Sequence, residues 1–215
     1  MTSSDVEQAQ QEYVQAAINA IKAGFDGVEV HGANGYLIDQ FINTASNIRK
    51  DMYGGSIENR SRFAIEVSKK VADAIGGDKT GIRISPYGVF NDMEIFESVD
   101  ETFEYLATEL GKLNLAYIHI VDHSSQGAPE VPQLIKDNIR GAFKGTFIAS
   151  GGLNLEKAET VLNDEKGDLV AFGVPFIANP DLVYRFKNNI ELSNPNPDTF
   201  FTPGIEGYLD YPIAN

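Results

Sequence analysis

Short apolar runs alternate with longer segments of helical periodicity along this chain of 215 residues, and this alternation limits its fold more than any other feature. Strands that are apolar on both faces are typical of parallel sheets covered by helices. The predicted strands are residues 27–31, 81–85, 117–122, 146–150 and 169–173. The predicted helices between them are residues 57–75, 100–113, 131–143 and 154–163. The sequence therefore predicts an α/β fold with a parallel sheet.

The chain opens with a helical pattern rather than a strand. Ser4 and Glu7 have the spacing of a capping box, and apolar residues follow at helical intervals. Gly24 suits the position just after a helix, where the backbone turns left-handed. We therefore expect a helix within residues 1–25 that leads into the first strand.

Two α/β architectures compete for this pattern. A doubly wound sheet usually carries a glycine-rich G-x-G-x-x-G turn after its first strand, and no predicted strand is followed by one. A (β/α)8 TIM barrel instead gathers polar residues at the carboxyl ends of several strands, as His31, Arg83 and Asp122 are placed here. A whole barrel needs eight strands and about 250 residues. We therefore expect an incomplete barrel of about five βα units, forming a single domain over residues 1–215.

Composition excludes several classes of partner. The net charge of −14 argues against nucleic acid or an anionic membrane as a partner. No cysteine is present, so disulfides and thiolate metal sites are ruled out. His119 and His123 do not have a spacing that completes a metal site, and we expect no metal. Without a recognisable signal peptide or spanning segment, we expect a cytoplasmic protein.

The most informative polar cluster follows the first predicted strand. His31, Asn34 and Tyr36 fall within six residues and offer N–H and phenolic O–H donors. Such a set suits binding a carbonyl oxygen and then supplying a proton, although a packed core histidine and a simple Asn-Gly turn are the alternatives. Arg83 lies inside an apolar strand, where a cation without a partner is costly, so we favour a functional role for it.

At this point the residues resemble a known family. The run from His31-Gly-Ala-Asn-Gly-Tyr36 through Tyr53-Gly-Gly-Ser-Ile-Glu-Asn-Arg60 closely resembles the Old Yellow Enzyme family of flavin-dependent ene-reductases. The likeness continues through the segments 81–86, 149–152, 179–182 and 207–212, and it covers nearly the whole chain as the C-terminal portion of the family's barrel. Asn34 and the segment 85–90 make the fungal branch the most similar.

The resemblance implies an activity and roles for individual residues. Family members are FMN-containing (β/α)8 barrels that take hydride from NAD(P)H and transfer it to the C=C bond of α,β-unsaturated carbonyl compounds. By resemblance, His31 and Asn34 bind the substrate carbonyl oxygen and Tyr36 protonates the α-carbon. Tyr208 resembles an aromatic residue that faces substrate from the C-terminal loop.

The resemblance also implies the cofactor contacts. Arg83 stands where the family places a cation beside the flavin ring, and Gly151, Gly152 and Gly173 stand where backbone N–H groups meet the FMN phosphate. Val174 occupies a position where the family commonly has a phosphate-binding arginine. A charge-assisted contact of this kind contributes about 1.5–3 kcal/mol. We therefore expect FMN affinity to be much weaker than is usual for the family.

Three interpretations follow from these observations. The leading one is an FMN-dependent oxidoreductase acting on enone-type small molecules with NAD(P)H as reductant. The alternative is a non-catalytic, truncated homologue that has lost flavin binding or needs a partner, such as another copy, to complete the barrel. A (β/α)8 isomerase or aldolase is a weaker third, because no lysine stands at a strand end for Schiff-base chemistry.

Overall fold

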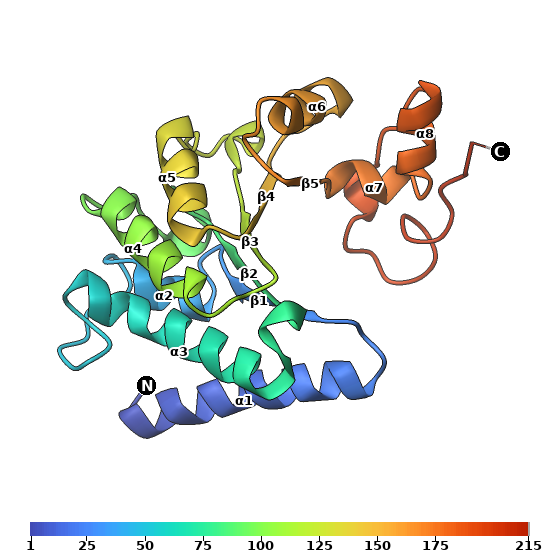
Figure 1. Ribbon diagram of the computed structural model, residues 1–215. Coiled ribbons are helices and arrows are strands. Elements are labelled where there is room, and N and C mark those ends of the chain that lie inside the picture. Colours follow the sequence, from blue (N-terminus) through green and yellow to red (C-terminus); the bar gives the residue numbers. More distant parts are fainter. Residues whose placement is uncertain (215) are drawn as a thin grey trace.

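The computed structural model describes residues 1–214, and its centre is a parallel sheet of five strands (Figure 1). The strands pair in chain order, each with the next, as in the wall of a barrel. They are β1 (Val28–Gly32), β2 (Thr80–Ile84), β3 (Tyr117–Ile120), β4 (Thr146–Ser150) and β5 (Leu169–Ala171). The predicted parallel α/β architecture with five βα units is therefore confirmed.

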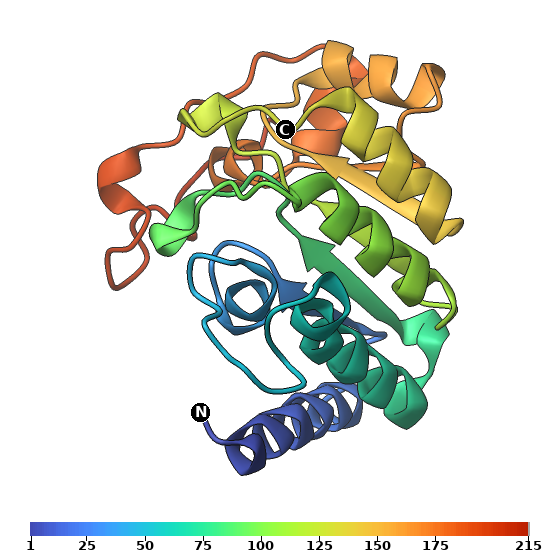
Figure 2. The same cartoon turned by 90° about the vertical axis from the view of Figure 1, so that its left-hand side faces the viewer.

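Helices join the strands and cover one face of the sheet. The helices are α1 (Ser3–Lys22), α2 (Leu37–Ile42), α3 (Ile57–Ile75), α4 (Val99–Gly111), α5 (Gln133–Phe143), α6 (Leu155–Asn163), α7 (Val174–Ala178) and α8 (Leu182–Asn188). Figure 2 shows α1, α3, α4 and α5 lying side by side in this order, and the contacts of α1 with α3, of α3 with α4 and of α4 with α5 agree with this view. Short 3₁₀ turns occupy Gly77–Lys79, Phe90–Asp92, Ser124–Gln126 and Pro197–Thr199. Over the described residues, 1–214, no helix is both long and apolar enough to cross a membrane.

The two faces of the sheet differ in chemistry. Side chains alternate across a strand, so residues aligned in the register share a face. Val30, Ile82, Ile118 and Phe147 form one aligned row, which is buried in the core beneath the helices. The next row, on the opposite face, begins with His31, Arg83 and His119, which are polar. In a closed barrel this second face is the interior, so the polar row belongs to the site rather than to the core.

The start of α1 corrects one prediction. Thr2 and Asp5 form the capping box, with the Thr2 N–H 2.6 Å from Asp5 Oδ2, and the predicted pair Ser4 and Glu7 does not. In both pairs an acidic residue follows a hydroxyl residue at the third position after it, which is the spacing of a capping box. The sequence alone therefore could not show which of the two pairs caps the helix. The end of the helix agrees with prediction, since Gly24 follows the C-cap with a φ of 100°.

Arg60, near the start of α3, is a buried arginine that joins two helices. It is only 3% exposed. Its guanidinium donates to the carbonyl oxygens of Ile42 and Gly55 and lies over the Phe96 ring, 5.1 Å from the centroid. The carbonyl group of Ile42, at the end of α2, has no partner within that helix, so the buried arginine satisfies it and links α3 to α2.

The C-terminal part forms two short helices that the sequence did not predict. In Figure 1, α7, α8 and the segment that follows them stand beyond β5, away from α1 to α5. Arg185 fixes this part by contacts to Asp181 and to the carbonyl oxygens of Glu191 and Pro212. Helices of five and seven residues are too short to display a clear period, which is why the pattern did not reveal them.

Candidate active site

A tight turn follows β1 and fixes the backbone of Asn34. Asn34 and Gly35 both have left-handed backbones, with φ of 61° and 71°. A Cβ on Gly35 would lie 2.4 Å from the carbonyl oxygen of Phe90, so only glycine fits there. The Asn34 N–H donates to Ser85 Oγ at 2.8 Å, which ties the turn to the end of β2. Asn34-Gly35 is therefore a turn and also part of the candidate site.

A buried carboxyl group, that of Asp39, is hydrogen-bonded to this turn. Asp39 Oδ2 accepts the Gly35 N–H at 2.9 Å and the Ser85 hydroxyl at 3.0 Å. Burial raises the pKa of Asp39 to about 6, against the lowering effect of these two hydrogen bonds. The carboxyl group therefore holds the Asn34 backbone in place through Ser85.

His31 lies on the polar face of the sheet, opposite Arg83 in the register, so the two side chains share one face as predicted. Burial first, and then the charge of Arg83, lower the pKa of His31, which keeps its ring neutral at pH 7. The exposed Tyr36 ring packs against the His31 ring, with 5.1 Å between their centroids. A neutral imidazole and a phenol thus lie together at the carboxyl end of β1.

His123, in the loop after β3, contacts the predicted site residue Asn34. Its Nε2 lies 2.8 Å from Asn34 Oδ1. Because that oxygen accepts, the Nε2 atom carries the proton, and the Asn34 amide keeps its two N–H donors for another acceptor. Burial, followed by the charge of Arg83, lowers the pKa of His123 and favours the neutral ring. The contact orients the asparagine amide.

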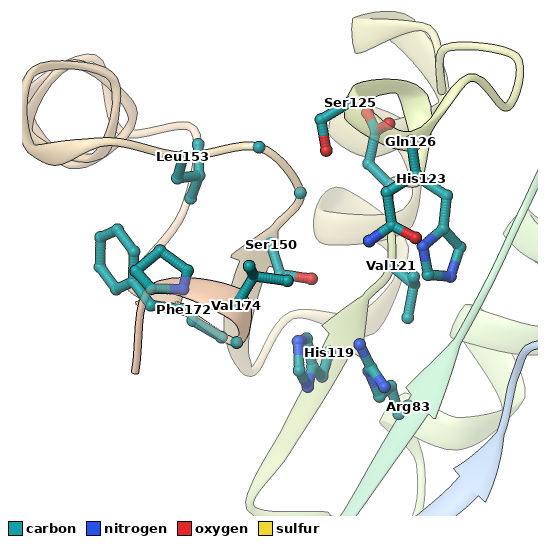
Figure 3. A pocket seen from close by; sticks show the side chains of 16 residues that line it. Arg83, His119, Val121, His123, Ser125, Gln126, Ser150, Leu153, Phe172 and Val174 are labelled. Atoms are coloured by element: carbon teal, nitrogen blue, oxygen red, sulfur yellow. The ribbon is translucent and has the colours of Figure 1, made fainter. Parts of the chain in front are cut away.

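A cavity of about 430 Å³ opens at the carboxyl ends of β2 to β5 (Figure 3). All five residues predicted to bind cofactor line it: Arg83, Gly151, Gly152, Gly173 and Val174. His31, Asn34, Tyr36 and Tyr208, predicted to act on substrate, are not among the lining residues. His123 joins the two groups, because it lines the cavity and also binds Asn34.

Glycine is required at one wall of this cavity. Gly151 has a φ of 119°, and a Cβ there would lie 2.2 Å from the Asp122 carbonyl oxygen. Gly152 has a φ of 58°, and a Cβ there would lie 2.6 Å from the Ser125 side chain. Gly173 is different, because a Cβ there would meet no atom within 4 Å. Two of the three glycines are therefore fixed by the fold, and the third faces open space.

The charge at the cavity suits an anionic ligand with polar groups. Arg83 has a buried Nε atom without a hydrogen-bond partner, and it makes no ion pair within the described part of the chain, residues 1–214. A half-buried cation in this state favours a negatively charged or hydrogen-bonding ligand. The glycine-lined wall and this arginine therefore fit FMN. Val174, where an arginine was expected by family resemblance, adds no second cation.

Tyr208 stands apart from these residues. Its exposed ring belongs to the C-terminal segment, and its hydroxyl donates to the Phe200 carbonyl oxygen at 2.9 Å. Within residues 1–214 its side chain makes no hydrogen bond to the strand-end residues. Its assignment to substrate stays a prediction.

Several residues of the site were not identified from the sequence. Ser85 and Asp39 fix the turn, His123 orients Asn34, and Glu29 holds His119. Glu29 and His119 share the alternation that places His31 and Arg83 on the inner face, so the strand period could have indicated them.

The chain belongs to the NADH:flavin oxidoreductase / NADH oxidase family, whose sequence model matches residues 1–193. This agrees with the resemblance to the Old Yellow Enzyme family. The fold is that of an incomplete barrel of this family.

Relatives come from plants and fungi. The chain is 44% identical over 210 residues to chanoclavine-I aldehyde reductase fgaOx3 of Penicillium roqueforti, covering 94% of this chain and 57% of that protein. It is 39% identical over 232 residues to 12-oxophytodienoate reductase 7 of Oryza sativa subsp. japonica, covering 99% and 58%. It is 37% identical over 227 residues to a protein of Claviceps fusiformis called "Probable inactive dehydrogenase easA", covering 100% and 59%.

A solved structure agrees with the fold. Morphinone reductase in complex with tetrahydroNAD superposes with a TM-score of 0.93 at 40% identity, covering 100% of this chain and 58% of that chain. The chain therefore spans less than two thirds of the length of each of these proteins.

Proposed function

We propose that this chain is the C-terminal part of an FMN-dependent oxidoreductase that transfers hydride from NAD(P)H to the activated C=C bond of α,β-unsaturated carbonyl compounds. The observation that carries the proposal is the cavity lined by Arg83, Gly151, Gly152 and Gly173, beside the end of β1, which bears His31, and the turn that bears Asn34. Relatives named as reductases of 12-oxophytodienoate and of morphinone support the reaction class, and the tetrahydroNAD complex supports a nicotinamide reductant.

Each residue has a role in this proposal. His31, neutral at pH 7, and Asn34, with free amide N–H groups, donate to the substrate carbonyl oxygen as negative charge builds there. Tyr36 supplies a proton to the α-carbon, and Tyr208 lies against the substrate from the C-terminal segment. Arg83, Gly151, Gly152, Gly173 and the backbone of Val174 hold FMN, which when bound supplies the hydride.

A second candidate is a non-catalytic homologue, and two observations favour it. Val174 offers no cation to a phosphate, and a relative at 37% identity is called a probable inactive dehydrogenase. In this view β1 and β5, which each pair with one strand over residues 1–214, await another segment or a second copy of the chain to close the barrel. The acidic, cysteine-free composition suits a reducing cytoplasm in either case.

Flavin binding to the Val174→Arg variant tests the proposal. A cation at this position should strengthen FMN binding by about 10- to 100-fold, which corresponds to the 1.5–3 kcal/mol of a charge-assisted contact. Equilibrium dialysis up to millimolar flavin measures this even where the unmodified chain binds weakly. Riboflavin, which lacks the phosphate, should gain nothing.

Val183→Arg provides the matched control. Val183 is 56% exposed on α8 and does not line the cavity, so an arginine there should change FMN affinity little. Equal gains in both variants would mean that net charge acts at long range and that the phosphate does not lie at Val174. Bound FMN without turnover of an enone by NAD(P)H would favour the non-catalytic candidate.

A further inference from the structure

A residue of the cavity wall has a buried imidazole nitrogen without a hydrogen-bond partner in the described part of the chain. His119 in β3 is 8% exposed, and its Nε2 atom has no hydrogen-bond partner among residues 1–214. Its side chain lines the cavity beside Arg83, as Figure 3 shows. Buried polar atoms in folded proteins are nearly always hydrogen-bonded, so an orphan at a cavity wall indicates a ligand atom that completes it.

The other ring nitrogen determines what Nε2 can do. His119 Nδ1 lies 2.9 Å from Glu29 Oε2. Burial works to raise the pKa of Glu29, but the hydrogen bond from His119, with the hydrogen bond from Tyr117 and the charge of Arg83, outweighs burial and holds that pKa below its ordinary value. An ionised carboxylate only accepts, so Nδ1 carries the proton. In the neutral ring, Nε2 is then a hydrogen-bond acceptor.

The surroundings of Glu29 keep this arrangement in place. Tyr117 lies in the register row of Glu29 and Gly81, next to the row of His31, Arg83 and His119, and its ring lies across Gly81, where a Cβ would come within 2.3 Å of it. Burial first, and then the charge of Glu29, raise the pKa of Tyr117 to about 12. The phenol therefore stays protonated at neutral pH, and Glu29 is the anion of this group.

We propose that His119 Nε2 accepts a hydrogen bond from a hydroxyl group of the bound ligand, and that Glu29 is a positioning residue that fixes the ring tautomer. The inference rests on the proposed function, in which FMN occupies the cavity. An acceptor needs a donor, and neither an ionised phosphate nor a ring carbonyl can donate, so the donors of FMN are the ring N3–H group and the polyol hydroxyl groups. His119 lies in β3, between Arg83 of β2, which the proposed function places at the ring, and Gly151 and Gly152 after β4, which it places at the phosphate. The polyol chain joins the ring to the phosphate, so its hydroxyl groups are the donors that this position suits.

Nitrogen-15 NMR of the histidine rings in the full chain tests this directly. The chain has three histidines, which single substitutions assign. Without ligand, His119 should carry its proton on Nδ1. FMN and riboflavin should both shift the Nε2 signal, because both have the polyol, whereas lumiflavin, which has the ring without the polyol, should not.

The outcomes separate this inference from the proposed function. If FMN shifts the backbone amides of Gly151 and Gly152 but leaves His119 Nε2 unchanged, the cavity binds flavin and the assignment of His119 is wrong. A shift with lumiflavin as well, or a proton on Nε2 in the free chain, also overturns it. If millimolar FMN moves none of these signals, the proposed function of this chain fails and the inference fails with it.

Substitutions add a binding readout. The amide of His119→Asn lies near the former Nδ1 and can still meet Glu29, but Nε2 is lost, while the longer His119→Gln side chain places an amide near the former Nε2. His119→Asn should weaken FMN and riboflavin binding about tenfold and leave lumiflavin unchanged. His119→Gln should retain most of the affinity. Equal losses in both variants would mean a packing role, and thermal unfolding checks that each variant folds.

Glu29→Gln tests the positioning role. The glutamine amide can either accept from Nδ1 or donate to it, so both ring tautomers should coexist and the Nε2 signal should move toward the protonated range. A variant that keeps a single Nδ1–H tautomer would show that Glu29 does not determine the proton position.

Discussion

Replacing Asp39 with asparagine should stabilise the fold at neutral pH and remove a pH-dependent part of its stability. Asp39 is 4% exposed, and its pKa is about 6 in the folded chain against an ordinary value of 3.8. The difference is about 2 units, and each unit corresponds to about 1.36 kcal/mol. Ionising this carboxyl group at pH 7 therefore costs the folded state about 3 kcal/mol.

The direction follows from proton binding. Between the two pKa values the folded chain binds more protons at Asp39 than the unfolded chain does, so stability falls as pH rises through about 4 to 6. The asparagine carbonyl can accept the same bonds from Gly35 and Ser85, since both donors reach one oxygen of Asp39. The variant should therefore be up to about 3 kcal/mol more stable at pH 7 and lack this slope.

Urea unfolding at a series of pH values measures the difference in free energy of unfolding between Asp39→Asn and the unmodified chain. Asp137→Asn is the control, because Asp137 is 40% exposed on α5. Burial works to raise its pKa, but the hydrogen bonds from Lys166 and Gln133 together outweigh burial and lower that pKa, so that variant should lose a little stability at pH 7. A difference for Asp39→Asn that is the same at pH 4 and pH 7, or a loss of stability at pH 7, would refute the reasoning.

Two further predictions concern the glycine wall and His31. Gly151→Ala should destabilise the fold by more than about 1 kcal/mol, because of its φ of 119° and the nearby Asp122 carbonyl. Gly141 lies in α5, and a Cβ there would meet no atom within 4 Å, so Gly141→Ala should instead stabilise the fold by about 0.5–1 kcal/mol. If urea unfolding showed the same change in stability for both variants, the steric argument would be contradicted. With flavin bound, His31→Ala should slow reoxidation by an enone about 10²–10³-fold and flavin reduction by NAD(P)H far less, and unchanged stopped-flow reoxidation would remove His31 from this role.

Local patterns in the sequence were sufficient for the main elements. The helix predicted over residues 57–75 coincides with α3, and the five predicted strands lie within a few residues of β1 to β5. Apolar runs and helical periodicity act within a few residues of one another, so they can be recognised without knowing the rest of the fold. The same strand-end reasoning placed His31 and Arg83 on one face, as the register has them.

Only the tertiary structure decided the contacts between distant segments. His119 and Glu29 are 90 positions apart, His123 and Asn34 are 89 apart, and Ser85 and Asp39 are 46 apart. Such pairs meet because the parallel register places residues of β1, β2 and β3 on one face of the sheet and brings the loops after these strands to one edge. The sequence by itself determined which strands exist and which residues end them. The tertiary structure decided which of those residues touch, which nitrogen of His119 lacks a partner within residues 1–214, and that Arg60 is buried, because each depends on neighbours that no local pattern specifies.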